Sequence, residues 1–171
     1  VFNQLLYAGV FRGQHSTGVF GQRKSDARVF SYKEALPSYA FMLQTEYTNI
    51  TKGLTNYVVP PAWIVGHSRH ATRGAVNARN AHPFSHGDIT LVHNGTLMDQ
   101  ELLPDHKNFE VDSENICHSI NTIGAAETIQ KLDGAFTLIW HDAKDNTLHI
   151  IRNDERPFHL ARCGLDWFGA S

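Results

Sequence analysis

Three short segments combine polar side chains with glycines at the ends of predicted strands, and a fourth places carboxylates at a predicted helix start. They are residues 11–18, 66–74, 92–95 and 111–114. An arginine fork suits an α-carboxylate, a carboxylate suits an α-ammonium group, and fixed N–H donors suit a developing oxyanion. Arg69, Asp112 and the Asn94–Gly95 pair supply one of each, as a ligand of amino-acid size would require. Taken singly, they also fit a surface salt bridge, a helix start and a hairpin turn.

The elements that must position these residues are mostly short strands. Apolar runs predict strands at 19–20, 29–30, 62–65 and 89–93, the third buried on both faces and the fourth ended by a turn at Asn94–Gly95. Thr96, with Asp99, fits the N-cap of a short helix. Helices are predicted at 2–8, 34–54 with a break at Pro37, 112–122 and 125–132. Strands at 135–140, 147–152, 158–161 and 166–168 complete an antiparallel meander, so an α+β fold is expected.

Composition excludes several classes of protein. The 171 residues include 15 Lys and Arg against 17 Asp and Glu, with 42% hydrophobic and 19% charged residues, which is typical of a globular domain. Without a basic cluster, a nucleic-acid contact is not expected. No apolar stretch is long enough to span a membrane and no basic leader opens the chain, so we expect a cytoplasmic location. Cys117 and Cys163 are too few for a disulfide scaffold and are expected as buried thiols.

The four segments together resemble the motifs of class II glutamine amidotransferases, the N-terminal-nucleophile type found in hexosamine-phosphate synthase and phosphoribosylpyrophosphate amidotransferase. Residues 12–18, R-G-Q-H-S-T-G, are similar to the family's R-G-x-x-S-x-G. Residues 66–74 resemble G-H-T-R-W-A-T-H-G, and residues 80–83 repeat N-A-H-P. Residues 92–95 repeat V-H-N-G, and 112–114 resemble D-T-E. Residues 132–136 and 152–157 are similar to the closing strands of that domain, so the resemblance spans nearly the whole chain, and the order of the motifs makes it specific.

The resemblance implies a glutaminase domain with the fold of the Ntn hydrolases, a four-layer αββα sandwich of two antiparallel sheets. In that family a cysteine at the mature N-terminus attacks the side-chain amide of glutamine, and its own α-amine acts as the general base. Glutamate and ammonia result. The ammonia would reach an unidentified acceptor on a synthase domain or subunit, and no cofactor or metal is expected.

The same resemblance implies roles for individual residues. Asn94 and Gly95 would stabilise the oxyanion, and Arg12 would support the loop of the nucleophile. Arg69 would bind the substrate carboxylate and Asp112 its amine. Thr72 and His82 would complete the substrate-binding set.

The chain departs from the family pattern at three places. It begins with Val1 rather than cysteine, so we expect residues 1–171 to form a single glutaminase domain without its first strand, its nucleophile and its C-terminal continuation. The alternative is a non-catalytic glutamine-binding or partner-binding domain on the same fold. His70 stands at the tryptophan of the family and Arg73 at its histidine.

Local motifs also suggest two other classes of hydrolase, a metal hydrolase and a serine hydrolase. A metal hydrolase would use histidines and an aspartate that cluster in one stretch, namely His67, His70, His82, His86, His93 and Asp88. No H-E-x-x-H helix accompanies them, and a spacing of three along a strand places two side chains on different faces. Ser68 follows an apolar run as in a nucleophile elbow, but the second glycine of that motif is missing.

Overall fold

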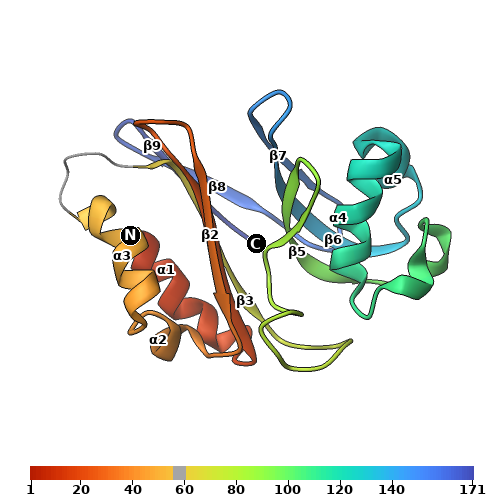
Figure 1. Ribbon diagram of the computed structural model, residues 1–171, viewed down its shortest axis with the longest axis horizontal. Coiled ribbons are helices and arrows are strands. Elements are labelled where there is room, and N and C mark those ends of the chain that lie inside the picture. Colours follow the sequence, from red (N-terminus) through yellow and green to blue (C-terminus); the bar gives the residue numbers. More distant parts are fainter. Residues whose placement is uncertain (56–60) are drawn as a thin grey trace. The chain divides into compact units, whose positions relative to one another are not determined.

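The computed structural model describes residues 1–55 and 61–171, and the chain forms two compact units, Val1–Pro83 and Phe84–Ser171 (Figure 1). Each unit contains an antiparallel sheet and helices. The predicted α+β class is therefore confirmed. No helix of the described residues is long and apolar enough to cross a membrane.

The first unit is built on a three-stranded sheet in the order β2-β1-β3. The central strand is β1 (Ser16–Arg23), which pairs antiparallel with β2 (Val29–Glu34) and with β3 (Pro61–Arg69). The helices α1 (Phe2–Ala8), η1 (Gly9–Phe11), α2 (Ser38–Phe41) and α3 (Thr45–Thr55) complete it. Val19 and Phe20 are both fully buried although they point to opposite faces of β1.

The helices pack on the face of β1 that carries Val19. The core between them contains one residue from each of α1, β1, α2 and α3, namely Leu6, Val19, Phe41 and Tyr47. The helix predicted at 34–54 is confirmed only in part. Residues 34–37 are not helical, α2 begins directly after Pro37, and residues 42–44 separate α2 from α3. The prediction that residues 62–65 are buried on both faces is wrong. Strand β3 lies at an edge of this sheet, and its residues are mostly half-buried.

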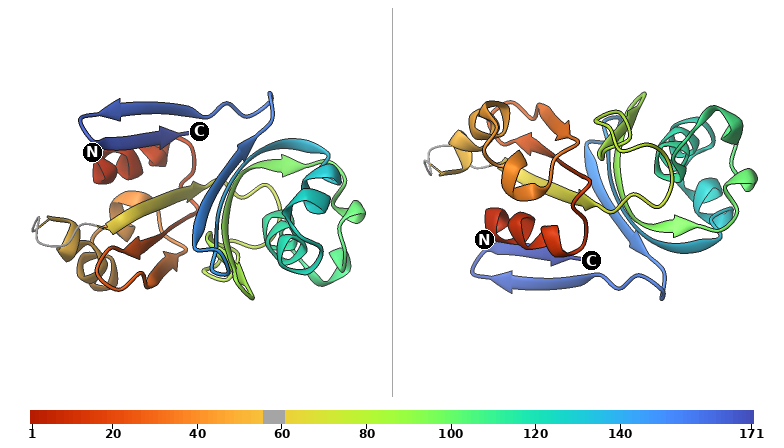
Figure 2. Two further views of the ribbon diagram at one scale, coloured as in Figure 1. Left: turned by 90° about the horizontal axis from the view of Figure 1, so that it is seen from above. Right: turned by 90° about the horizontal axis from the view of Figure 1, so that it is seen from below.

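The second unit is built on a four-stranded antiparallel sheet in the order β4-β5-β6-β7. These strands are β4 (Phe84–His86), β5 (Ile89–Leu97), β6 (Gly134–Asp142) and β7 (Thr147–Arg152). Helices α4 (Asp112–Ile123) and α5 (Ala125–Gln130) cover one face, and Figure 2 shows the sheet curving around them. The core of this unit lies between that face and α4, which contributes Ile116, Cys117 and Ile120. Two short 3-10 helices, η2 (Gln100–Leu102) and η3 (His106–Asn108), connect β5 to α4.

The turn predicted at Asn94–Gly95 is wrong, because β5 continues through it to Leu97. Asn94 pairs with Thr137 and Gly95 pairs with Phe136 in the ladder with β6. Thr96 therefore lies in the strand and caps no helix. Asp99 instead caps η2, where its carboxylate accepts a hydrogen bond from the Glu101 amide at 3.2 Å.

The predicted four-strand meander is also wrong at its end. Strands β8 (His159–Cys163) and β9 (Asp166–Ala170) pair only with each other among the described residues and form a two-stranded sheet. This hairpin exposes nearly all of its side chains, so Cys163 is exposed and not buried as expected. Cys117 is buried, as predicted.

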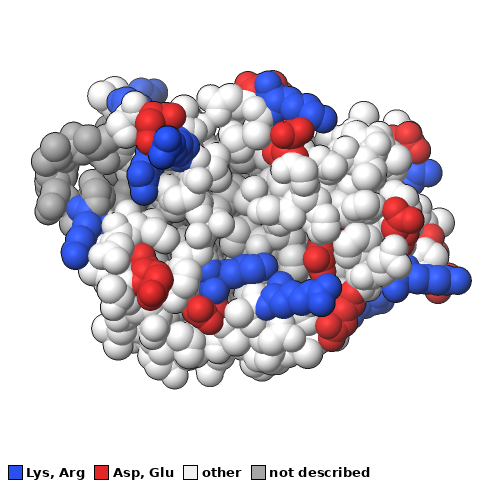
Figure 3. All heavy atoms as spheres, viewed as in Figure 1, with Lys and Arg blue, Asp and Glu red and all other residues white. Residues whose placement is uncertain are grey.

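Charged side chains of both signs are interspersed on the face shown in Figure 3. The Lys and Arg residues there form no continuous basic surface, in line with the formal net charge of −2.

Candidate active site

The glycine-rich segment 12–18 contacts the segment that carries Arg69 within the first unit. Ser16 pairs with Arg69 across β1 and β3, and the His15 amide donates to the Arg69 carbonyl at 3.0 Å. In return, the Ala71 amide donates to Nδ1 of His15 at 2.8 Å. Gly13 packs directly on this backbone, because a Cβ on it would lie 2.2 Å from the carbonyl carbon of Arg69. Strand pairing, hydrogen bonds and direct backbone contact thus join segments 12–18 and 66–74 within the first unit.

Arg69 is buried, and its guanidinium group organises the loop that follows β3. It donates to the carbonyl of Ala75 at 3.3 Å and to the carbonyl of Arg73. Thr72, in the same loop, is exposed. The structure therefore gives Arg69 a structural contact in addition to the substrate contact that the resemblance implies.

Arg12 lies at an open pocket of about 430 Å³ formed by residues 10–15 and His70. The ring of His70 stacks on that of His15, with 4.7 Å between the ring centroids. Arg12 itself is exposed.

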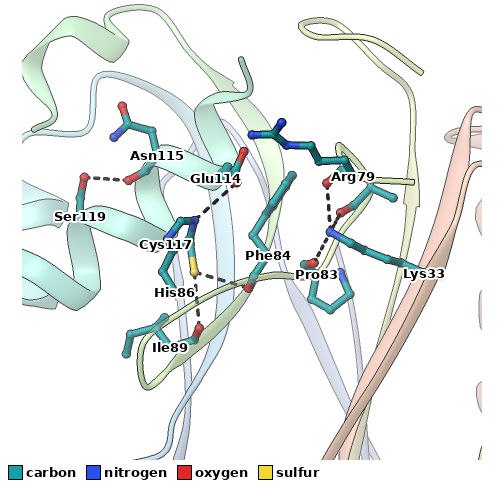
Figure 4. Close-up of polar contacts among 11 residues, drawn as sticks. Lys33, Arg79, Pro83, Phe84, His86, Ile89, Glu114, Asn115, Cys117 and Ser119 are labelled. Carbon is teal, nitrogen blue, oxygen red and sulfur yellow. Dashed lines mark hydrogen bonds and ion pairs between the residues drawn. The ribbon is translucent and has the colours of Figure 1, made fainter. Parts of the chain in front are cut away.

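Lys33 holds the N-A-H-P segment from the neighbouring strand β2. Its Nζ donates to three backbone carbonyls, those of Ala81 at 2.7 Å, Pro83 at 2.9 Å and Arg79 at 3.1 Å (Figure 4). An ammonium group has three N–H donors, so one side chain can satisfy all three carbonyls. His82 lies within this segment, buried, and its ring contacts that of His67 with 3.9 Å between centroids.

Asn94 and Gly95 lie in β5 with opposite orientations. The side chain of Asn94 points to the face of the sheet away from α4, where its Nδ2 donates to Oγ of Ser171 at 2.9 Å. The Cα of Gly95 is close to the neighbouring strand, since a Cβ there would lie 1.8 Å from the Ala135 carbonyl oxygen. Only glycine fits at this position without moving backbone.

Asp112 lies on the other side of the sheet, at the start of α4. One carboxylate oxygen accepts the Leu97 amide at 2.9 Å, and the other accepts the Ser113 amide at 2.8 Å. The Ser113 hydroxyl is 3.0 Å from Nδ1 of His93, a buried residue of β5. Burial lowers the pKa of His93 below its ordinary 6.5, while the nearby Asp112 carboxylate acts in the opposite direction. His93 therefore links the V-H-N-G strand to the helix that carries Asp112.

The structure groups the predicted site residues by unit. Arg12, Arg69, Thr72 and His82 belong to the first unit, and Asn94, Gly95 and Asp112 belong to the second. Within the second unit, hydrogen bonds connect Asp112 to the end of the strand that carries Asn94 and Gly95, although Asn94 points to the opposite face.

Neither Cys117 nor Cys163 lies where it could attack a glutamine amide bound at Asn94. Cys117 lies in the core on the α4 side of the sheet, and its thiol contacts the carbonyls of Phe84 at 3.4 Å and Ile89 at 3.6 Å (Figure 4). Cys163 is exposed in the β8–β9 hairpin.

The two rival hydrolase interpretations find no support in the geometry. Among residues 1–55 and 61–171, no group of three or more His, Cys, Asp or Glu side chains is arranged to hold a metal ion. Ser68 lies inside β3, paired with Thr17, and residues 70–83 after the strand form a loop. The nucleophile-elbow interpretation is therefore wrong, because that motif requires a sharp turn from strand into helix.

Sequence reasoning missed three polar residues that contact the motif segments, namely Lys33, Thr137 and Ser171. Lys33 lies beyond the strand predicted at 29–30, and only the structure extends that strand to Glu34. Nothing in the local sequence marks Thr137 or Ser171, whose importance depends on the neighbours that the fold gives them.

Comparison with known proteins agrees with these motifs. A family model described as a glutamine amidotransferase domain matches residues 67–171, which is more than half of the chain. The chain therefore belongs to the family of glutamine amidotransferase domains.

Curated relatives include two glutamine–fructose-6-phosphate aminotransferases (isomerizing). The protein from Shewanella oneidensis is 31% identical over 110 residues, which are 54% of this chain and 18% of that protein. The one from Caulobacter vibrioides is 38% identical over 90 residues, or 43% of this chain and 15% of that protein. The matched region thus covers less than a fifth of each of these two relatives.

Two solved structures share the fold. One is the allosteric regulatory enzyme of purine biosynthesis, with a TM-score of 0.67 at 21% identity, covering 96% of this chain and 38% of that one. The other is the glutamine phosphoribosylpyrophosphate amidotransferase from B. subtilis in complex with ADP and GMP, with a TM-score of 0.64 at 20% identity and the same coverage. These likenesses confirm the predicted α+β fold.

Proposed function

We propose that this domain hydrolyses the side-chain amide of glutamine to glutamate and ammonia, and that the ammonia is transferred to an acceptor on a synthase domain or subunit. The observation that carries the proposal is the Asn94–Gly95 pair on β5, where the amide nitrogen of Asn94 is held in one orientation by Ser171. Glutamine also appears in the names of the relatives with which this chain shares its family. We also propose that the protein is located in the cytoplasm.

In the proposed reaction, a thiol sulfur bonds to the amide carbon of glutamine and the carbonyl oxygen becomes an oxyanion. The carbon–nitrogen bond then breaks, and ammonia leaves with the proton of the thiol. Water hydrolyses the resulting thioester, which releases glutamate and restores the thiol. The thiol is the N-terminal cysteine that the resemblance implies, since Cys117 and Cys163 lie elsewhere in the fold.

The remaining site residues bind glutamine or support the nucleophile. Arg69 binds the α-carboxylate and Asp112 the α-ammonium group, with Thr72 and His82 beside them and Arg12 supporting the nucleophile's loop. Arg69 and Asp112 are both held by backbone groups, through the loop carbonyls and the Leu97 amide respectively. Side chains fixed in this way lose little further entropy when a ligand binds.

Ammonia transfer requires a partner site. Free ammonia is protonated in water and is then no longer a nucleophile, so a sheltered path to the acceptor is needed. A synthase domain or subunit would provide that path and the acceptor.

The test is the release of products from glutamine by the full-length protein. We expect glutamate and ammonia in equal amounts, with no release from asparagine, whose amide is one methylene closer to the backbone. Binding of glutamine by calorimetry without any release of glutamate would instead identify a non-catalytic glutamine-binding domain. Absence of both binding and release would contradict the proposal altogether.

A further inference from the structure

The hydroxyl group of Ser171 lies among three polar groups on the face of the sheet that carries Asn94. Its Oγ is 2.9 Å from Nδ2 of Asn94, 2.9 Å from the carbonyl oxygen of Pro157 and 3.1 Å from Oγ1 of Thr137. Thr137 is the cross-strand partner of Asn94 on β6, so their side chains share one face. The hydroxyl of Thr137 donates in turn to the Arg156 carbonyl at 2.8 Å.

Counting the protons in this chain of contacts gives each hydrogen bond a direction. The Arg156 and Pro157 carbonyls can only accept, and the single proton of Thr137 is used by Arg156. The single proton of Ser171 therefore goes to Pro157 or Thr137, and neither of them can donate to it. The Ser171 oxygen is left as an acceptor toward Asn94.

An accepting hydroxyl can face the NH2 of a side-chain amide but not its oxygen. The network therefore selects one of the two orientations of the Asn94 amide, which differ by a half-turn about its terminal bond. In the selected orientation, one hydrogen of Nδ2 is bound to Ser171 and the second points elsewhere on the same face. In the opposite orientation, the amide oxygen would take the place of that donor.

We propose that Ser171 is a positioning residue that presets the Asn94 amide as a donor to the oxyanion, with Thr137 and the Pro157 carbonyl fixing the direction of its own hydrogen bond. This inference rests on the proposed function, in which Asn94 stabilises the oxyanion. Without the hydroxyl, the amide can turn and present its oxygen to a developing negative charge. Because the oxyanion exists only in the transition state and the intermediate, the loss falls on kcat and leaves KM for glutamine unchanged.

The experiment compares Ser171→Thr with Ser171→Val in the full-length protein, by steady-state formation of glutamate from glutamine. Thr and Val have the same shape, so both variants share any effect of the added methyl group and differ only in the hydroxyl. We expect kcat of Ser171→Val to be about 5- to 10-fold below that of Ser171→Thr, the effect of losing one positioning hydrogen bond. The KM values and unfolding temperatures of the two variants should agree.

The same pair is then made in the Asn94→Ala background, where a residue that acts through Asn94 no longer has a target. We expect the difference in kcat between Thr and Val to disappear there. Equal kcat values for Ser171→Thr and Ser171→Val beside an intact Asn94 would overturn the proposal, and so would a difference that persists without Asn94. Failure of the proposed function is a separate result, since it requires that the wild-type protein itself release no glutamate.

Discussion

The Cα of Gly18 lies so close to the carbonyl oxygen of His82 that a Cβ on residue 18 would be 1.8 Å from that oxygen. Two motifs that are 64 residues apart in the sequence (82 − 18) are thus in direct backbone contact. The last glycine of the R-G-x-x-S-x-G segment is needed because the N-A-H-P segment passes over it. Both residues belong to the first unit, so this contact is part of a single compact structure.

Gly18→Ala should displace the 79–83 segment, because the obstructing atom is a backbone carbonyl and cannot rotate away. We expect a loss of about 1–3 kcal/mol in the free energy of unfolding, the usual range for overpacking, and a higher KM for glutamine. Hydrogen exchange of the first unit and steady-state kinetics of the full-length protein measure the two effects. Ser31→Ala, an exposed change on the adjacent strand β2, is the control. A Gly18→Ala protein that matches the wild type in both would show that the two backbones are not in contact.

Lys33→Met should leave three loop carbonyls without their ammonium donor while keeping most of the apolar stem. We expect a loss of about 2 kcal/mol in the free energy of unfolding, as for removal of a hydrogen-bonded charged group. Lys144→Met is the matched control, since Lys144 is 67% exposed and pairs with Asp88 at the surface. The account predicts little change for that variant. Equal unfolding temperatures for the two variants would argue against the three-carbonyl contact.

His93 should make the second unit sensitive to acid. Its pKa in the folded protein is lowered from 6.5 by burial, so below about pH 6.5 the unfolded chain binds a proton that the folded chain does not. The stability of the folded state is therefore fully present above that pH and decreases as the pH falls toward the lowered pKa. Hydrogen exchange of the β5 and α4 amides at about pH 7.5 and pH 5.5 measures this slope.

The His93→Asn variant should show a shallower dependence on pH, whatever its overall stability. His159→Asn is the control, because His159 is exposed in the β8–β9 hairpin. An unchanged slope in His93→Asn would show that another group titrates in this range.

The sequence predicted the fold class and the strands well where the pattern is local. Alternating and continuous apolar runs gave β1, β2, β5, β6 and β7, and the amphipathic pattern after residue 112 gave α4. The Asn94–Gly95 dipeptide was wrongly predicted as a turn, because this dipeptide has a strong local preference for turns. Pairing of β5 with β6 overrides that preference and brings Ala135 against Gly95. Cross-strand partners are set by the whole sheet and are not visible in a short window of sequence.

In the candidate site, too, residues within a local motif could be predicted from the sequence, whereas their partners from distant segments could not. The motifs located His82 and Asn94, but not Lys33, which holds the segment that carries His82, or Ser171, which holds the side chain of Asn94. Lys33 binds carbonyls 46 to 50 residues further along the chain, and Ser171 is 77 residues from Asn94. A lysine and a serine are common surface residues, and only their neighbours in the folded chain show what they position.

The most direct measurement of the central claim is kcat for glutamate formation by the full-length protein with Asn94 and with Asn94→Ala, each with its KM for glutamine. Asn108→Ala, an exposed change in the connection between β5 and α4, is the control and should match the wild type. The account predicts that Asn94→Ala lowers kcat about 100-fold or more, the typical loss for an oxyanion donor, with little change in KM. A folded Asn94→Ala protein with the wild-type kcat would contradict it.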